Sequence, residues 1–254
     1  MPRTISKYGW CPDLPDHRDH FYSVVVQPTK LTPSVDLREQ CPPVYDQGQL
    51  GSCTANAISG AFEFEQMKQK LTPFMPSRLF IYYNERAMEG TVHQDSGAQI
   101  RDGIKSVNTQ GVCPESMWPY NDTGIQFIQK PSDDCYSTAA KNLVITYQRL
   151  SQNLNMMKGC LASGYPFVFG FTVYDGFESE QVANTGMLKM PTRGEKQVGG
   201  HAIMAVGYED SLNSFIIRNS WGSGWGVKGY FYMPYTYATN SGLADDFWTI
   251  RIVE

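Results

Sequence analysis

Residues from two distant parts of the sequence have the chemistry needed for nucleophilic catalysis. Cys53 follows the small residues Gly51 and Ser52 and begins a segment with helical periodicity. A cysteine in the first turn of a helix faces unpaired backbone N–H groups and the positive end of the helix dipole, and both favour the nucleophilic thiolate. The same position also suits a buried structural cysteine, so this segment alone leaves both interpretations open.

A predicted hairpin in the second half of the chain supplies a base. The segments HAIMAVGY and SFIIRN have strand composition, and the turn-forming residues 209–211 join them. With the midpoint near Asp210, paired residue numbers sum to about 420, so His201 lies opposite Asn219 with Cβ atoms about 4.5–5.5 Å apart. Asn219 can then accept a hydrogen bond from one ring nitrogen, while the other nitrogen faces a thiol. The sequence therefore predicts a nucleophile, a base and a residue that orients the base.

The elements that must position these residues change in type along the chain. Apolar residues recur at helical spacing after Cys53, and helices are also expected over residues 77–88 and 98–109. From about residue 143 onward the strand signals are NLVITYQRL, YPFVFGFTVY, HAIMAVGY, SFIIRN and GYFYMPY. This order predicts an α+β fold with a helical N-terminal lobe, a β-rich, barrel-like C-terminal lobe and an active-site cleft between them.

Composition limits the partners of the protein. The chain has 254 residues, 41% hydrophobic and 18% charged, with a formal net charge of −4. Without a basic run, nucleic acid is not expected as a partner, and no apolar stretch is long enough to span a membrane. The N-terminus lacks the apolar core of a secretory signal. Localisation stays open: cytoplasmic, or secreted or periplasmic if a leader has been removed. We expect a monomer.

Residues 1–32 form an N-terminal extension before a main domain at residues 33–254. The extension carries the sequence WCP, then a charged cluster and a strand-like run at residues 22–26. His17 and His20, flanked by acidic residues, have the types that chelate a metal, but a solvated charged turn explains the same pattern, and no metal site is assigned. The chain holds six cysteines without C-x-x-C spacing, so structural zinc is not expected.

The blocks around the chemical residues resemble the papain-like cysteine peptidases of the C1 family. They are DQGQLGSCTANA, GGHAIMAVGYED and IIRNSWGSGWGVKGYFYMPY, in that order. Details such as SCTANA, PSRLFIYYNER and DFWTIRIVE are most similar to a bacterial, xylellain-like branch. The sequence departs from the family at Leu50, which replaces a disulfide-forming cysteine, and at Thr54, which replaces an aromatic residue.

The resemblance implies roles for further residues. Gln47 would donate to the oxyanion, and Gly97 would bind substrate backbone. Gly200 would border the specificity pocket, and Trp221 would shield the His–Asn hydrogen bond beside the substrate. It also suggests a Cys113–Cys135 disulfide and, less strongly, Cys11–Cys41.

The implied activity is that of a cysteine endopeptidase, which cleaves peptide or protein substrates through a thioester and needs no metal or organic cofactor. Two alternatives stay open: a papain-fold acyl transferase or transpeptidase, and a non-catalytic peptide-binding homologue. Relatives are often made as zymogens with a long helical pro-domain. The shorter extension here is expected to lie across or beside the cleft as a regulatory segment, or else to be an inert packing arm.

Overall fold

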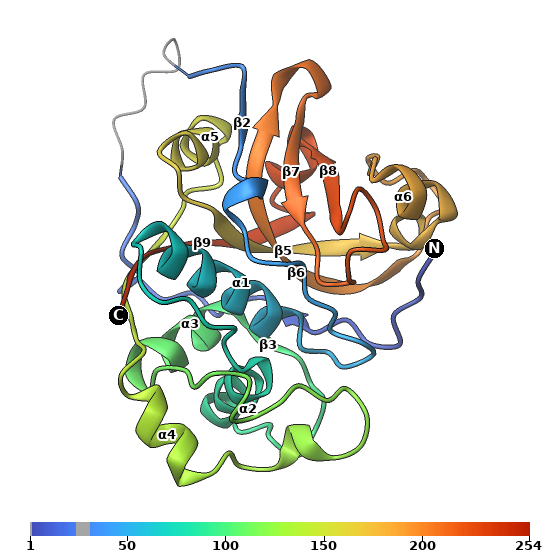
Figure 1. The fold of residues 1–254 in the computed structure, drawn as a ribbon. Coiled ribbons are helices and arrows are strands. Elements are labelled where there is room, and N and C mark those ends of the chain that lie inside the picture. The colour runs from blue at the N-terminus through green and yellow to red at the C-terminus, as the bar shows by residue number, and fades with distance from the viewer. Residues whose placement is uncertain (1, 24–30) are drawn as a thin grey trace.

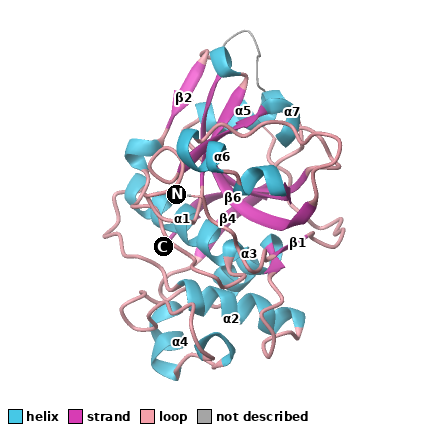
Figure 2. Cartoon of the chain, turned by 90° about the vertical axis from the view of Figure 1, so that its right-hand side faces the viewer, coloured by secondary structure: helices cyan, strands magenta, loops and turns pink. Residues whose placement is uncertain are grey.

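The structure is a computed structural model that describes residues 2–23 and 31–254. The predicted strand-like run at residues 22–26 extends outside the described residues, and Phe21, just before it, makes an isolated bridge to Arg149. Figure 1 shows a helical lobe and a sheet-rich lobe, with one long helix between them. Figure 2 shows the same division from the side.

The helical lobe comes first in the chain, as predicted. Its helices are α1 (Cys53–Lys68), α2 (Arg78–Glu89), α3 (Ile100–Thr109) and α4 (Asp133–Ala139), with a 3-10 turn at Gln126–Ile128. The Ser77 hydroxyl caps α2 by accepting from the Phe80 N–H, and Gly90 ends the helix with φ of 73°. Among the described residues, no helix is both long enough and apolar enough to cross a membrane.

The second lobe is built on one large antiparallel sheet. Its strands are β4 (Val144–Arg149), β5 (Phe167–Tyr174), β6 (Gln197–Glu209), β7 (Ser214–Arg218), β8 (Tyr230–Pro234) and β9 (Ala244–Val253), in the order β4-β9-β5-β6-β7-β8. Strand β2 (Ser34–Asp36) adds to β6, so residues before the helical lobe cross to the sheet. The lobe also holds α5 (Leu154–Ala162), α6 (Glu180–Thr185), α7 (Tyr235–Ala238) and 3-10 turns at Asp175–Glu178 and Asp210–Leu212.

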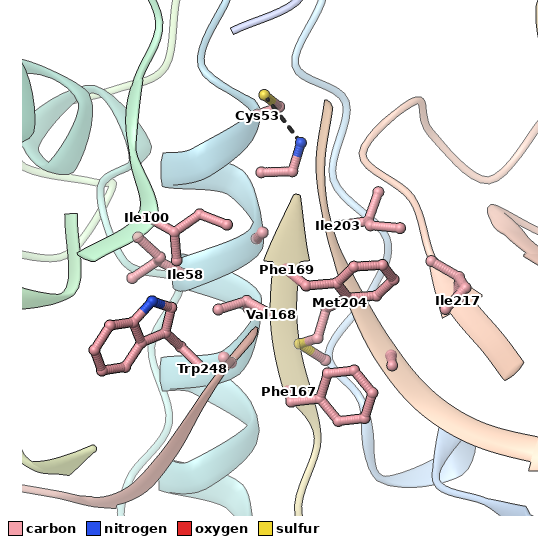
Figure 3. Packing of buried hydrophobic residues seen from close by; sticks show 14 of the residues in the cluster. Cys53, Ile58, Ile100, Phe167, Val168, Phe169, Ile203, Met204, Ile217 and Trp248 are labelled. Carbon is pink, nitrogen blue, oxygen red and sulfur yellow. Dashed lines mark hydrogen bonds between the residues drawn. The ribbon is translucent and has the colours of Figure 1, made fainter. Parts of the chain in front are cut away.

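Helix α1 joins the two lobes. It packs on β6 and β9 on one side and on α2 and α3 on the other, so most of its residues are buried. Figure 3 shows Ile58 of α1 close to Val168 and Trp248 from the sheet. This packing fixes the first turn of α1, and therefore Cys53, at the junction of the two lobes.

The register of the β6–β7 hairpin differs from the prediction. Met204 pairs with Arg218, so the pairing is displaced by two positions, and the register shifts again after Ala205. The cause is the connection: a 3-10 turn followed by Asn213 with φ of 48° is longer than the predicted tripeptide turn. Asn219 consequently lies just beyond the end of β7 rather than within it.

The predicted Cys113–Cys135 and Cys11–Cys41 disulfides are not formed, and all six cysteines are free thiols. Cys113 and Cys135 are both buried. Burial raises the pKa of the Cys113 thiol, and the nearby Cys135 raises it further. The Cys135 sulfur instead contacts the Ser132 hydroxyl at 3.3 Å. The Cys11 thiol donates to the Ser96 carbonyl, and the Cys41 thiol donates to the Leu37 carbonyl four residues earlier.

Candidate active site

Cys53 is the first residue of α1 and is fully buried. Its sulfur accepts a hydrogen bond from the backbone N–H of Ala202 at 3.3 Å, which Figure 3 shows as a dashed line. Burial raises the pKa of the thiol to about 12, and the N–H groups of Ala202 and Gly9 oppose that rise. In the covered state seen here, Cys53 is therefore a neutral thiol.

His201 directly precedes Ala202, so β6 brings the imidazole beside the thiol. The His201 Nε2 lies 2.8 Å from the Asn219 Oδ1, which also accepts the Ser220 N–H at 2.8 Å. Because that oxygen only accepts, Nε2 carries the proton and Nδ1 keeps a lone pair. Nδ1 has no hydrogen-bond partner among the described residues. The predicted contact between His201 and Asn219 is confirmed, although the register from which it was derived was wrong.

Aromatic rings enclose the His201–Asn219 hydrogen bond. The Trp221 ring centre lies 5.5 Å from that of His201, and Phe177 packs against both rings. Burial lowers the pKa of His201 to about 4, while the hydrogen bond that its Nε2 donates to Asn219 opposes this shift. The imidazole is therefore neutral at pH 7 in the covered state.

Gln47 is held in a fixed orientation next to these residues. Its Oε1 accepts from the Ser220 hydroxyl at 2.5 Å, and its Nε2 donates to the Leu50 carbonyl at 3.1 Å. A side-chain amide has two N–H donors, so one donor remains beyond the bond to Leu50. The backbone N–H of Cys53, in the first turn of α1, supplies a second donor without an intrahelical partner.

A segment of the N-terminal extension lies over the site. We call residues 5–13 the strap. Within it, β1 (Trp10–Cys11) pairs in parallel with β3 (Ala98–Gln99), and the Ala98 N–H donates to the Gly9 carbonyl at 2.8 Å. The Tyr8 ring centre lies 5.8 Å from that of His201. The strap therefore buries the thiol and the imidazole, which accounts for the direction of both pKa shifts.

Two predicted substrate-binding glycines contact the strap. Gly97 has φ of 72°, and a Cβ there would lie 2.1 Å from the Gly9 carbonyl oxygen. A Cβ on Gly200 would lie 2.7 Å from the Trp10 ring. Both positions require glycine because the backbone of the strap approaches them closely.

Sequence reasoning missed the residues that anchor the strap. The Tyr8 hydroxyl donates to Glu178 at 2.8 Å, and the Trp10 indole N–H donates to the buried carboxylate of Asp246 at 3.0 Å. The Trp248 indole in turn donates to Asp13 at 2.8 Å. The only sequence signal is the cluster of tyrosine, glycine and tryptophan at residues 8–10.

The described residues contain no group of three or more metal-ligating side chains that could hold a metal ion. The carboxylates that flank His17 and His20 are paired with arginines instead. Asp16 binds Arg18 at 2.7 Å, and Asp19 binds Arg101 at 2.7 Å. Both carboxylates are thus in ion pairs, but the Asp19–Arg101 pair is buried, so this segment differs from the expected solvated turn.

Comparisons with known proteins agree with this geometry. The family described as papain family cysteine protease matches residues 31–250. Xylellain, a cysteine protease from Xylella fastidiosa, is 46% identical, and its structure matches 100% of this chain and 99% of that chain with a TM-score of 0.92. An uncharacterized peptidase C1-like protein of Acanthamoeba polyphaga mimivirus is 43% identical over 98% of this chain and 88% of the relative. Pro-cathepsin H of Bos taurus is 26% identical, and the match spans 78% of this chain but only 58% of that protein.

Proposed function

The chain belongs to the papain family of cysteine proteases, and on that basis we propose that it is an endopeptidase that forms a thioester with its substrate. The observation that carries the proposal is the pair of contacts at the lobe junction: the sulfur of Cys53 against Ala202, and His201 against Asn219 at 2.8 Å. These contacts support the assignment of Cys53 as nucleophile, His201 as base and Asn219 as the residue that orients the base.

The reaction proceeds in two acyl-transfer steps. The Cys53 proton moves to Nδ1 of His201, and the sulfur attacks the peptide carbonyl to give a tetrahedral oxyanion. The Cys53 N–H and the Gln47 amide donate to this oxyanion, each contact being worth about 2.7–4 kcal/mol. His201 then protonates the leaving amine as the C–N bond breaks. Water, deprotonated by His201, attacks the thioester, and the thiol leaves with the returned proton.

We also propose that residues 1–32 regulate the domain formed by residues 33–254. A substrate must displace the strap, because the strap covers the surfaces of Gly97 and Gly200 that we assign to substrate binding. The strap directs the backbone N–H of Gly9 toward the Cys53 sulfur. An N–H group cannot be attacked by a thiolate, so the strap blocks the site without being a substrate there.

The remaining assignments concern the substrate. A cavity of about 410 Å³ borders Gly200 and is lined by Trp10, Thr172 and Leu243 among others. We assign this cavity to a large side chain of a peptide or protein substrate. We assign Trp221, whose ring packs on that of His201, to substrate binding beside the imidazole. Displacement of Trp10 would enlarge this space, because the indole forms part of its wall.

Labelling and product analysis test the proposal. An epoxide that traps reactive thiolates should label Cys53 in the full chain, and the Cys53→Ala variant should show neither labelling nor cleavage. Cleavage within a long peptide supports an endopeptidase, whereas release of end residues only contradicts it. A competing amine captured as the main product would instead indicate an acyl transferase. Absence of labelling and cleavage in the wild type, with and without the strap, would contradict the enzyme assignment.

A further inference from the structure

A buried carboxyl group lies behind the nucleophile and has no role in the mechanism described above. Glu85 of α2 is fully buried, and its Oε1 accepts from the Thr54 hydroxyl at 2.6 Å. Thr54 directly follows Cys53 in the first turn of α1. The Oε2 of Glu85 has no hydrogen-bond partner within the described part of the chain. The carboxyl is thus attached to the helix turn that carries the reactive sulfur.

The surroundings of Glu85 favour its uncharged form. Burial raises the pKa of Glu85 well above its ordinary range; the bond from Thr54 opposes this shift, while Glu89 and Asp102 add to it. The positive charge of Arg86 also opposes the shift, but its guanidinium donates to backbone carbonyls and not to Glu85. Negative charge on Glu85 would also raise the pKa of the Cys11 and Cys53 thiols. A protonated carboxyl can donate to the Thr54 oxygen, so the bond persists in the neutral state.

The neighbouring helix is shaped to admit this carboxyl. A Cβ on Gly103 of α3 would lie 2.5 Å from the Glu85 Oε2 and 2.4 Å from the Cδ1 of Ile58. Only a glycine leaves room there for both side chains. Thr54, Glu85 and Gly103 together fill this space with a polar contact.

Negative charge on Glu85 would oppose negative charge on the nucleophile. The two groups are near enough that an ionised Glu85 raises the pKa of Cys53. In a buried region the repulsion between two anions is poorly screened by solvent. A carboxyl at this position is compatible with thiolate formation only if it stays protonated.

We propose that Glu85 is a positioning residue: its uncharged carboxyl holds Thr54, and through Thr54 it fixes the first turn of α1 so that the Cys53 sulfur is aimed at the substrate carbonyl. This inference rests on the proposed function of Cys53 as nucleophile. It adds a residue that touches neither the substrate nor the sulfur and acts through its neighbour.

Paired variants of the full-length chain test this role. Glu85→Gln keeps shape and neutrality, and Glu85→Leu removes the hydrogen bond; Thr54→Ser and Thr54→Val form the matched pair. Peptide cleavage, Cys53 alkylation by uncharged iodoacetamide and melting temperature are measured for each. We expect the Gln and Ser variants to stay within about threefold of wild type, and the Leu and Val variants to lose about tenfold or more in kcat with KM nearly unchanged. The double Leu/Val variant should lose no more than either single variant.

Several results would overturn the inference. If Glu85 were charged at pH 7, Glu85→Gln would lower the pKa of Cys53 and speed alkylation about fivefold or more. Equal activity of all four single variants would remove the positioning role, and additive losses in the double variant would separate the two residues. If Glu85→Leu fails to fold, the comparison of the activities of Thr54→Val and Thr54→Ser still tests the positioning role. A wild type that neither labels nor cleaves refutes the proposed function itself, which is a different outcome.

Discussion

Replacing Trp10 by alanine should open the active site. The change removes the indole hydrogen bond to the buried Asp246 and the packing of the ring on Gly200. A hydrogen bond to a charged group contributes about 1.5–3 kcal/mol. Truncating a fully buried tryptophan to alanine costs about 3–5 kcal/mol. The cost is smaller for Trp10, because its ring is only half-buried. Since the two contributions overlap, about 2–3 kcal/mol is lost from strap closure, which corresponds to roughly 30- to 150-fold in the opening equilibrium.

The assay is the second-order rate of Cys53 alkylation by an epoxide at pH 7, because only an open site admits the reagent. Trp10→Ala should accelerate labelling by roughly 30-fold or more, and Trp10→Phe, which keeps the ring but loses the hydrogen bond, should give about tenfold. Leu14→Ala is the control, since this side chain is 69% exposed just beyond the strap. A rate for Trp10→Ala within about threefold of wild type would refute the view that the strap limits access.

Further predictions concern pH, the oxyanion and the thiols. Burial raises the pKa of Glu65 to about 8, so its contribution to stability is complete below pH 4.5 and is lost as the pH rises through 8. Glu65→Gln should therefore raise Tm in calorimetry at pH 9 by several degrees and leave it nearly unchanged at pH 4.5. The pKa of His201 is lowered to about 4, so its contribution to stability is lost as the pH falls rather than as it rises. Between pH 6.5 and 4 the wild type should lose about 3 kcal/mol of unfolding free energy in urea titrations, a loss that His201→Gln should not show. Gln47→Ala should lower kcat about 10²–10³-fold in peptide cleavage; a change in KM alone would contradict its oxyanion role. Protein purified without oxidant and then unfolded should titrate six thiols, because all six cysteines are unbonded; four would indicate a bridge.

Local patterns predicted the helices well because their signals lie within each segment. The helical spacing after Cys53 and the helix expected over residues 77–88 correspond to α1 and α2, the second to within one residue at each end. The contact of His201 with Asn219 was also predicted, but from a hairpin register that differs from the one in the structure. The hairpin register depends on the length of its turn and on the irregularity after Ala205, and neither has a reliable sequence signal.

Long-range partners could not be predicted from the sequence. Trp10 and Asp246 are hydrogen-bonded although 236 positions separate them, and no periodicity connects them. Strand β9 was not among the expected strands because Asp245 and Asp246 interrupt its apolar pattern. Asp246 also has φ of 59°, an uncommon conformation for a residue other than glycine, which suits an anchor rather than a regular strand position.

The strap belongs to the same polypeptide as the site that it covers, and this sets how the protein responds to dilution and to competitors. A tethered blocker has an effective concentration in the millimolar range, whatever the amount of protein in solution. Dilution therefore cannot activate the molecule, and a weakly binding peptide at micromolar levels hardly displaces the strap. Opening without cutting is transient, since the released segment stays within reach and closes again. If the strap regulates the enzyme as proposed, lasting activity requires a cut in the chain between the strap and helix α1.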